Sequence, residues 1–234
     1  MKIYSCLFGL MTLISGPSFA QWIPNQSDVI YSANNPAHNT KIYISSARHA
    51  NGTGPVFSDP RYPNGVRGEC RGRSENYLSY LAAVYLAAVN TSFAVNNSSS
   101  TYYYPLRQRG YTIRIGRASP GTAATRANNW GASRFIALHS NAKANPQPPC
   151  NRTVTGGRGA TIIFQSWGTS GGQGLSELIK GQLKDVTPGS TDYICHLSSP
   201  CTTIALTELL ATNAVAAYSE TEFHDWNLGS DFLD

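Results

Sequence analysis

Charged residues are scarce in this sequence. Asp, Glu, Lys and Arg together make up 13% of its 234 residues, against about 25% in a typical soluble domain. Glycine and proline are plentiful instead, with 21 and 13 residues, which predicts long loops. The 41% of hydrophobic residues and the 13 tyrosines exclude a wholly disordered chain, because disorder goes with few aromatic residues and a high net charge. The length predicts one domain, or at most two small ones.

Long hydrophobic runs are also missing. The apolar run Cys6–Ile14 is too short to cross a bilayer comfortably as a helix, which takes about 20 residues. Preceded by Lys2 and followed by Ser-Phe-Ala at 18–20, it has the pattern of a secretory signal peptide; an uncleaved membrane anchor is the alternative. We therefore expect residues 1–20 to be removed and the rest to be exported, into the periplasm or out of the cell, without stable membrane insertion.

No pair of cysteines has the Cys-x-x-Cys spacing of a structural zinc site, which argues against cysteine-bound zinc. Beyond the leader the chain has an even number of cysteines, Cys70, Cys150, Cys195 and Cys201. In an oxidising compartment four cysteines predict two disulfides, with three possible pairings. The short loop between Cys195 and Cys201 is the easiest to close, which would leave Cys70 to pair with Cys150.

The sequence has no run of Lys and Arg of the kind that binds nucleic acid. Its net charge is nevertheless positive, at +5. This sign suits an anionic polymer such as a cell wall, although the sign alone does not choose a partner. We expect no nucleic-acid partner, and the sequence says nothing about the oligomeric state.

Strand and helix patterns alternate along most of the chain. Residues 21–40 lack periodicity and predict an irregular arm, so the domain is expected to span 41–234. Loops are expected over 47–73 and over the polar segment 90–101. The expected helices are Glu75–Val89, Ala123–Trp130 and Gly172–Lys184. The expected strands are Lys41–Ser45, Tyr111–Ile115, Arg134–His139, Ala160–Gln165, Thr203–Leu206 and Ala214–Tyr218.

This alternation predicts an α/β fold: a single domain with a mostly parallel twisted sheet flanked by helices, of the phosphorylase/hydrolase-like kind. In such sheets, sites form beyond the carboxyl ends of the strands. His49, His139 and Glu220 follow or end predicted strands, and Glu75 begins a predicted helix that can face the same edge. Two histidines and a carboxylate are a recurrent catalytic zinc set, and a further carboxylate can act as general base.

Each of these residues also has an ordinary interpretation. A lone loop histidine such as His49 is more often simply solvated. Glu75 alone would be an acid placed in a first helical turn, where the helix dipole favours it. Spacing by itself therefore leaves the metal site as one of several interpretations.

A longer sequence motif supports the metal-site interpretation more specifically than the spacing does. The segment from Ala127 to Ala142, ANNWGASRFIALHSNA, closely resembles the signature Ala-Asn-x-x-Gly-Ala-Asp-x-Phe-Ile-Ser-Ile-His-x-Asn-Ala of the zinc-dependent N-acetylmuramoyl-L-alanine amidases (type 3 catalytic domain). Tyr111–Arg117 looks like the strand ending in Thr-Arg of that family. Asn213–Phe223 resembles its closing segment, Pro-Ala-Val-Leu-Val-Glu-x-x-Phe. The resemblance covers roughly residues 41–226.

The resemblance implies a role for each matching residue. His49, Glu75 and His139 correspond to the three zinc ligands, and Glu220 to the catalytic glutamate. Glu222 is the second choice for the catalytic glutamate, because residues two apart on an extended chain point the same way. Asn141 is expected to touch substrate or to orient the loop, with an ordinary turn residue as the alternative.

The family activity implied is hydrolysis of the amide between N-acetylmuramic acid and the L-alanine of the peptidoglycan stem peptide, with Zn²⁺ as cofactor. Two departures from the family pattern stand out. The loop written Asp-Pro-Gly-His-Gly-Gly in the family is SARHAN over Ser46–Asn51 here and keeps only the histidine, and Ser133 replaces the usual Asp. The altered loop around His49 makes a catalytically inactive wall-binding protein one alternative. A zinc peptidase that cuts stem peptides, on a related α/β scaffold, is the other.

Overall fold

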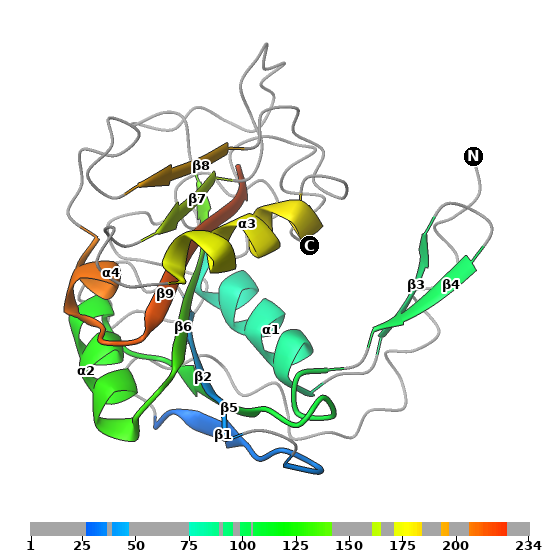
Figure 1. Ribbon diagram of the computed structural model, residues 1–234, viewed down its shortest axis with the longest axis horizontal. Coiled ribbons are helices and arrows are strands. Elements are labelled where there is room, and N and C mark those ends of the chain that lie inside the picture. Colours follow the sequence, from blue (N-terminus) through cyan, green and yellow to red (C-terminus); the bar gives the residue numbers. More distant parts are fainter. Residues whose placement is uncertain are drawn as a thin grey trace.

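A computed structural model of the chain shows helices packed on both sides of a large sheet (Figure 1). The described residues are 27–36, 39–46, 75–88, 91–95, 99–103, 105–141, 161–164, 171–183, 193–196 and 206–223. The helices in them are α1 (Glu75–Ala88), α2 (Pro120–Trp130), α3 (Gly172–Leu183) and α4 (Thr207–Ala211). The strands are β1 (Val29–Tyr31), β2 (Lys41–Ser46), β3 (Thr91–Val95), β4 (Ser99–Tyr103), β5 (Thr112–Gly116), β6 (Arg134–Asn141), β7 (Thr161–Phe164), β8 (Tyr193–His196) and β9 (Val215–Phe223).

The main sheet has seven described strands in the order β1-β5-β2-β6-β9-β7-β8. Its centre is parallel, since β5, β2, β6 and β9 run in one direction, and β7 and β8 are parallel to each other. The β1–β5 and β7–β9 pairs are antiparallel. The predicted α/β fold with a mostly parallel sheet is confirmed.

One face of the sheet packs against α2 and α4. Alternate residues of the central strands point to this side and are fully or almost fully buried, among them Tyr43, Phe135 and Tyr218. The rings of Tyr43 and Phe135 stack with their centroids 5.6 Å apart. Ala123 and Ala127 of α2 are fully buried against them, so small helical residues let the helix approach a layer of large rings.

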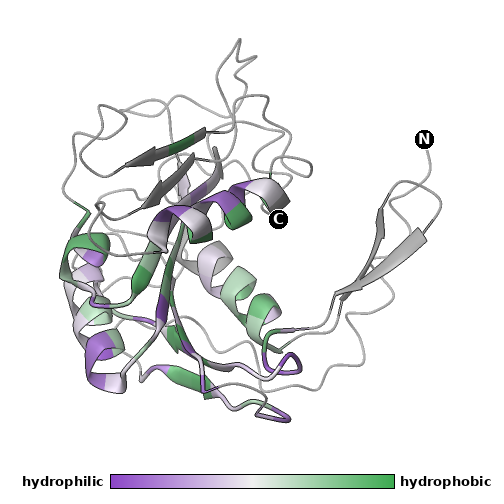
Figure 2. Ribbon diagram, viewed as in Figure 1, coloured by the Kyte–Doolittle hydropathy of each residue, from purple (hydrophilic) through white to green (hydrophobic). Residues whose placement is uncertain are grey.

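The opposite face packs against α1 and α3. Isoleucines of β2 and β5 pack against the buried Ala83 and Ala87 of α1, and α3 packs over Ala217 of β9. Figure 2 shows α1 as mostly apolar, whereas α2 and α3 mix hydrophilic and hydrophobic residues. The result is three layers, with helices on both sides of the sheet.

The direction of α1 follows from its last turn. The N–H groups of Leu106 and Arg107 donate to the carbonyls of Leu86 and Ala87, at 2.9 and 3.2 Å. These acceptors end α1, and the donors lie in the segment that leads into the amino end of β5. The helix therefore runs antiparallel to β5, and its first residue, Glu75, is carried to the end of the sheet where the parallel strands finish.

The local sequence explains the ends of α2. Pro120 occupies the first turn, where its missing N–H costs nothing. Gly131 ends the helix in the left-handed conformation, with φ 71°, and its N–H donates to the carbonyl of Asn128 at 2.9 Å. This explains the Gly-Ala pair of the motif, because the chain must reverse here before β6 begins.

Asp28 ties the N-terminal segment to the sheet. Its side chain is 1% exposed and accepts hydrogen bonds from Arg114 Nε at 2.7 Å, Arg126 Nη1 at 2.6 Å and the hydroxyl of Tyr43 at 3.0 Å. Burial, followed by the nearby Asp28 carboxylate, raises the pKa of the Tyr43 phenol well above its ordinary value. The next three residues then pair with β5 as β1.

Several expected elements differ from the structure. The arm over 21–40 is not irregular throughout, because Val29–Tyr31 form β1; three residues are too few to show a period, and their partner strand is distant in sequence. The expected loop over 90–101 instead contains β3 and the first half of β4, which form an antiparallel pair; their serine-rich composition does not show a strand pattern. Leu206 is not in a strand: it precedes α4 and accepts hydrogen bonds from the N–H groups of Leu209 and Leu210.

Other expectations fall on residues that the structure does not describe. The leader at 1–20, the loop over 47–73 and the segment that holds Cys150 lie outside the described residues, as does Cys201. The disulfide pairing and the domain limits therefore stay predictions. Within the described part of the chain, no helix is long and apolar enough to cross a membrane.

Candidate active site

His139 is the central group of the candidate site. It lies on β6, just after the point where the neighbouring strand β2 ends, and is 4% exposed. Like Phe135 and Ala137 it points to the α2 and α4 side of the sheet, since residues two apart in a strand share a face. Its ring stacks on the ring of Tyr218 of β9, with centroids 4.3 Å apart and planes 18° from parallel.

Glu220 is the direct neighbour of His139 on the adjoining strand. The register of β6 and β9 pairs the two residues, so both side chains leave the same face at the carboxyl end of parallel strands. The hydroxyl of Tyr218 donates to Glu220 Oε1 at 3.0 Å. The structure thus places side by side two residues that the sequence proposes, one as a metal ligand and one as an acid–base group.

The register also bears on Glu222, the second choice for the catalytic glutamate. Between His139 and Asn141 the pairing of β6 with β9 shifts, so that Asn141 pairs with Phe223. Glu222 lies within this irregularity, between Glu220 and Phe223, whereas Glu220 lies in the regular part beside His139. The side chain of Glu222 is outside the described residues, and so is that of Asn141.

Glu208 is a further acid at the site, not among the residues predicted from the sequence. This acid lies on the short helix α4 and is 3% exposed. Ser45 at the end of β2 donates a hydrogen bond through Oγ to Glu208 Oε1, and Glu208 Oε2 lies 3.1 Å from His139 Nε2. The only signal in the sequence was the rarity of acids, since the chain has 13 in total.

The structure describes the other two predicted ligands only in part or not at all. Glu75 is the first residue of α1 and reaches the same end of the sheet as His139, but its side chain is outside the described residues. His49 is also outside them. Within the side chains that the structure describes, no group of three or more His, Cys, Asp and Glu forms a metal site, so the grouping of His49, Glu75 and His139 stays a prediction.

Much of the motif around His139 has a structural role. The Asn128 side chain at the end of α2 donates to the carbonyl of Ala211 at 2.8 Å and accepts from the N–H of Asn213, also at 2.8 Å. It thereby connects α2 to the turn between α4 and β9, the two elements that carry Glu208 and Glu220. The motif therefore positions the site as well as contributing to it.

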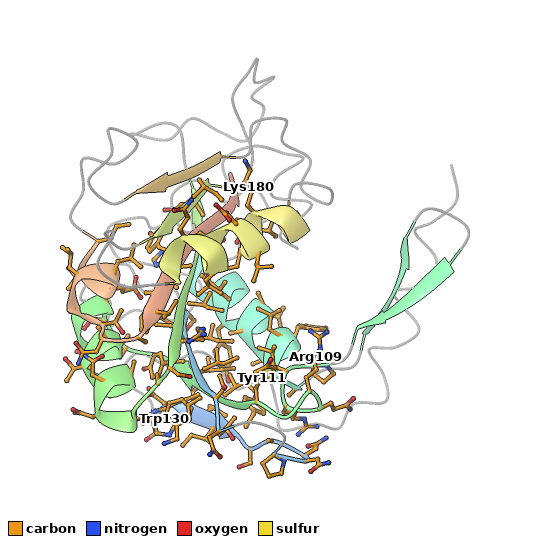
Figure 3. The ribbon with its side chains drawn as sticks, in the orientation of Figure 1. Arg109, Tyr111, Trp130 and Lys180 are labelled. Carbon is orange, nitrogen blue, oxygen red and sulfur yellow. The ribbon has the colours of Figure 1, made fainter. Side chains whose placement is uncertain are left out.

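The opposite end of the sheet carries a different cluster. Trp130, labelled in Figure 3 at the end of α2, has Lys41 Nζ at 5.3 Å and the Arg114 guanidinium at 5.9 Å from its ring. Lys41 Nζ also donates to the carbonyl of Trp130 at 3.0 Å. Since Lys41 begins β2 and Trp130 shortly precedes β6, this cluster stabilises the fold at the end of the sheet away from His139.

Comparison with known proteins gives no match to any family model or to any curated protein. Solved structures of the same fold are found. The N-acetylmuramoyl-L-alanine amidase from Clostridium difficile 630 superposes with a TM-score of 0.56 at 15% identity, over 83% of this chain and 86% of that one. The amidase Ami1 from Mycobacterium smegmatis gives 0.52 at 12% identity, over 85% and 88%. AmiC2 of Nostoc punctiforme gives 0.52 at 12%, over 84% and 93%. At such identities the likeness establishes the fold.

Proposed function

We propose that this protein is a zinc-dependent peptidoglycan hydrolase that cleaves the amide between N-acetylmuramic acid and the L-alanine of the stem peptide. The observation that carries the proposal is the pairing of His139 with Glu220 at the carboxyl ends of β6 and β9. The fold shared with solved amidases of this specificity supports it, and so does the resemblance of the segments around both residues to that family.

The donor set fits zinc. His139 offers an imidazole nitrogen and Glu75 a carboxylate, which are common zinc ligands, and both belong to elements that meet at one end of the sheet. His49 follows Ser46, the last residue of β2, by three positions in the sequence. His49, Glu75 and His139 would hold the ion.

A bound zinc ion supplies a Lewis acid that polarises a substrate carbonyl and lowers the pKa of water. The chain's own contribution is proton transfer by Glu220, which takes a proton from the attacking water and delivers it to the departing amine of L-alanine. The hydroxyl of Tyr218 holds Oε1 of that carboxylate at 3.0 Å. Asn141, the last residue of β6, takes no part in this proton transfer and is the candidate contact to the substrate.

The test is digestion of purified peptidoglycan by the protein without its leader, with and without a zinc chelator, followed by mass analysis of the products. Free stem peptides that begin with L-alanine, together with intact glycan strands, are expected only when zinc is present. Shortened peptides would identify a zinc peptidase instead. Binding to the wall with no zinc-dependent release would identify a catalytically inactive wall-binding protein.

The place of action follows from the substrate. Peptidoglycan lies outside the cytoplasmic membrane, and the leader predicted at residues 1–20 would carry the protein there. The same oxidising surroundings would allow the disulfides Cys195–Cys201 and Cys70–Cys150 to form. Peptide mapping without reduction, on protein recovered from the periplasm or medium, would test both the cleavage near Ala20 and the pairing.

A further inference from the structure

Glu208 is an acid at a buried position where an apolar residue would cost less free energy to bury. Its neighbour Leu209 belongs to the buried cluster between α4 and the sheet, and Glu208 itself is 3% exposed. Moving a carboxylate out of water costs several kcal/mol, and acids are almost never fully buried unless they are paired. Stability alone therefore does not explain this residue.

Both oxygens of Glu208 are engaged at the ends of two adjacent strands. Oε1 accepts from the Ser45 hydroxyl of β2, and Oε2 lies 3.1 Å from His139 Nε2 of β6. An ionised carboxylate can only accept hydrogen bonds, so a hydrogen bond between it and His139 places the proton on Nε2, the nitrogen that faces it. In the neutral imidazole the other nitrogen, Nδ1, then has the lone pair that a metal ion requires.

We propose that Glu208 is a positioning residue that fixes His139 in the tautomer with its proton on Nε2 and its lone pair on Nδ1. The proposal rests on the proposed function only in offering that lone pair to zinc. A carboxylate bonded to the far nitrogen of a metal-binding histidine sets the orientation of the ring and makes it a better ligand. Stacking on Tyr218 at 4.3 Å holds the plane of the ring, and Glu208 fixes its rotation within that plane.

The tautomer can be measured without zinc and without substrate. Two-bond ¹H–¹⁵N correlation spectra distinguish the two neutral tautomers, and the signals of His139 are those that disappear in His139→Asn. In the zinc-free protein, at a pH where the imidazole is neutral, the proton is expected on Nε2. Glu208→Leu is expected to give a mixture of tautomers, whereas Glu177→Gln, which changes an exposed acid on α3, should leave the spectrum unchanged.

Zinc affinity gives the second measurement, by competition with a chelator. Glu208→Leu is expected to bind zinc about 10–100-fold more weakly. Glu208→Gln should lose less, because its amide oxygen can still accept from Nε2 and its amide nitrogen can donate to Ser45. Glu177→Gln should bind as the unchanged protein does.

Three results would overturn the proposal. The first two are a proton on Nδ1 in the unchanged protein and an unaltered tautomer in Glu208→Leu. The third is a zinc affinity that falls more than about 1,000-fold in both Glu208 variants, which would make Glu208 a ligand itself. If Glu208→Leu does not fold, the tautomer measured in the unchanged protein still tests the proposal. Failure of the proposed function would appear separately, as absent peptidoglycan cleavage with the Nε2 tautomer intact.

Discussion

His139 and Glu220 are paired residues on adjacent parallel strands, and both project from the same face at the strand ends. Tyr218 connects them, since its ring stacks on the imidazole and its hydroxyl donates to the carboxylate. The proposed nitrogen ligand and the proposed proton acceptor are therefore held by the centre of the sheet rather than by loops. Sites built on strands keep their geometry more closely than sites on loops.

Replacing Glu220 by Gln should abolish proton transfer while leaving the shape of the site unchanged. We expect the rate of stem-peptide release to fall by about 10²–10⁴-fold, the usual contribution of a general acid–base group. Bound zinc, measured by metal analysis, should stay the same. The matched control is Glu222→Gln, which should retain activity within a few fold. If the large loss occurs in Glu222→Gln instead, the roles of the two glutamates are reversed.

The sequence was informative where its signals were local. The apolar segment Arg134–His139 predicted a buried strand, and that strand now carries His139 near its end. Gly131 ends α2 in the left-handed backbone conformation, and such a helix end depends on only a few neighbouring residues. Glu220 was found through its resemblance to a family segment, and the strand register brings it beside His139.

What the sequence missed depends on contacts between distant residues. The role proposed for Glu208 depends on its contacts with His139, 69 positions away, and with Ser45, 163 positions away. No spacing rule connects residues so far apart. The strand β1 escaped detection for the same reason, because its partner β5 supplies the hydrogen bonds that make three residues a strand.

Glycine is required at position 116 for a packing reason. A Cβ atom there would lie 2.6 Å from Cε1 and Cζ of Tyr43, a ring that the fold buries completely. Gly116→Ala should therefore destabilise the protein by about 1–3 kcal/mol, as overpacked cores do, measured by urea unfolding. Gly174→Ala on α3 is the control, since nothing lies within 4 Å of its added atom. It should be neutral or stabilise by up to about 1 kcal/mol, and an equal loss in both variants would contradict the packing argument.

The buried phenol of Tyr43 should make the free energy of unfolding fall at alkaline pH. Burial and the Asp28 carboxylate raise its pKa above the ordinary value of 10.0, so the folded protein keeps this proton after the unfolded chain has lost it. The stabilisation is fully present below about pH 10 and is lost as the pH rises further, by up to about 1.4 kcal/mol per pH unit. Urea unfolding between about pH 8 and 11, on either side of the ordinary tyrosine pKa, should show this slope, and Tyr43→Phe should make it shallower. Equal slopes in the two proteins would show that Tyr43 ionises normally.

Removing the charge of Asp28 should loosen the N-terminal segment. Asp28→Asn keeps the shape but leaves Arg114 and Arg126 without their shared carboxylate, whose side chain is 1% exposed. We expect a loss of about 2–3 kcal/mol, less than the ~3–5 for a fully buried pair, because the two arginine side chains are 23% and 31% exposed and water can still solvate them. Hydrogen exchange should increase first at β1 and β5.

Glu177→Gln provides the matched control for that charge change. Glu177 is an exposed acid on α3 that accepts a hydrogen bond from Gln173 at 2.9 Å, and exposed substitutions of this kind usually shift the free energy of unfolding by less than about 0.5 kcal/mol. If Asp28→Asn changes stability no more than Glu177→Gln does, the arginines find equivalent partners elsewhere and Asp28 does not anchor β1. A large loss in Asp28→Asn alone, with faster exchange in β1, makes residues 27–31 an integral part of the domain, which then begins before Lys41.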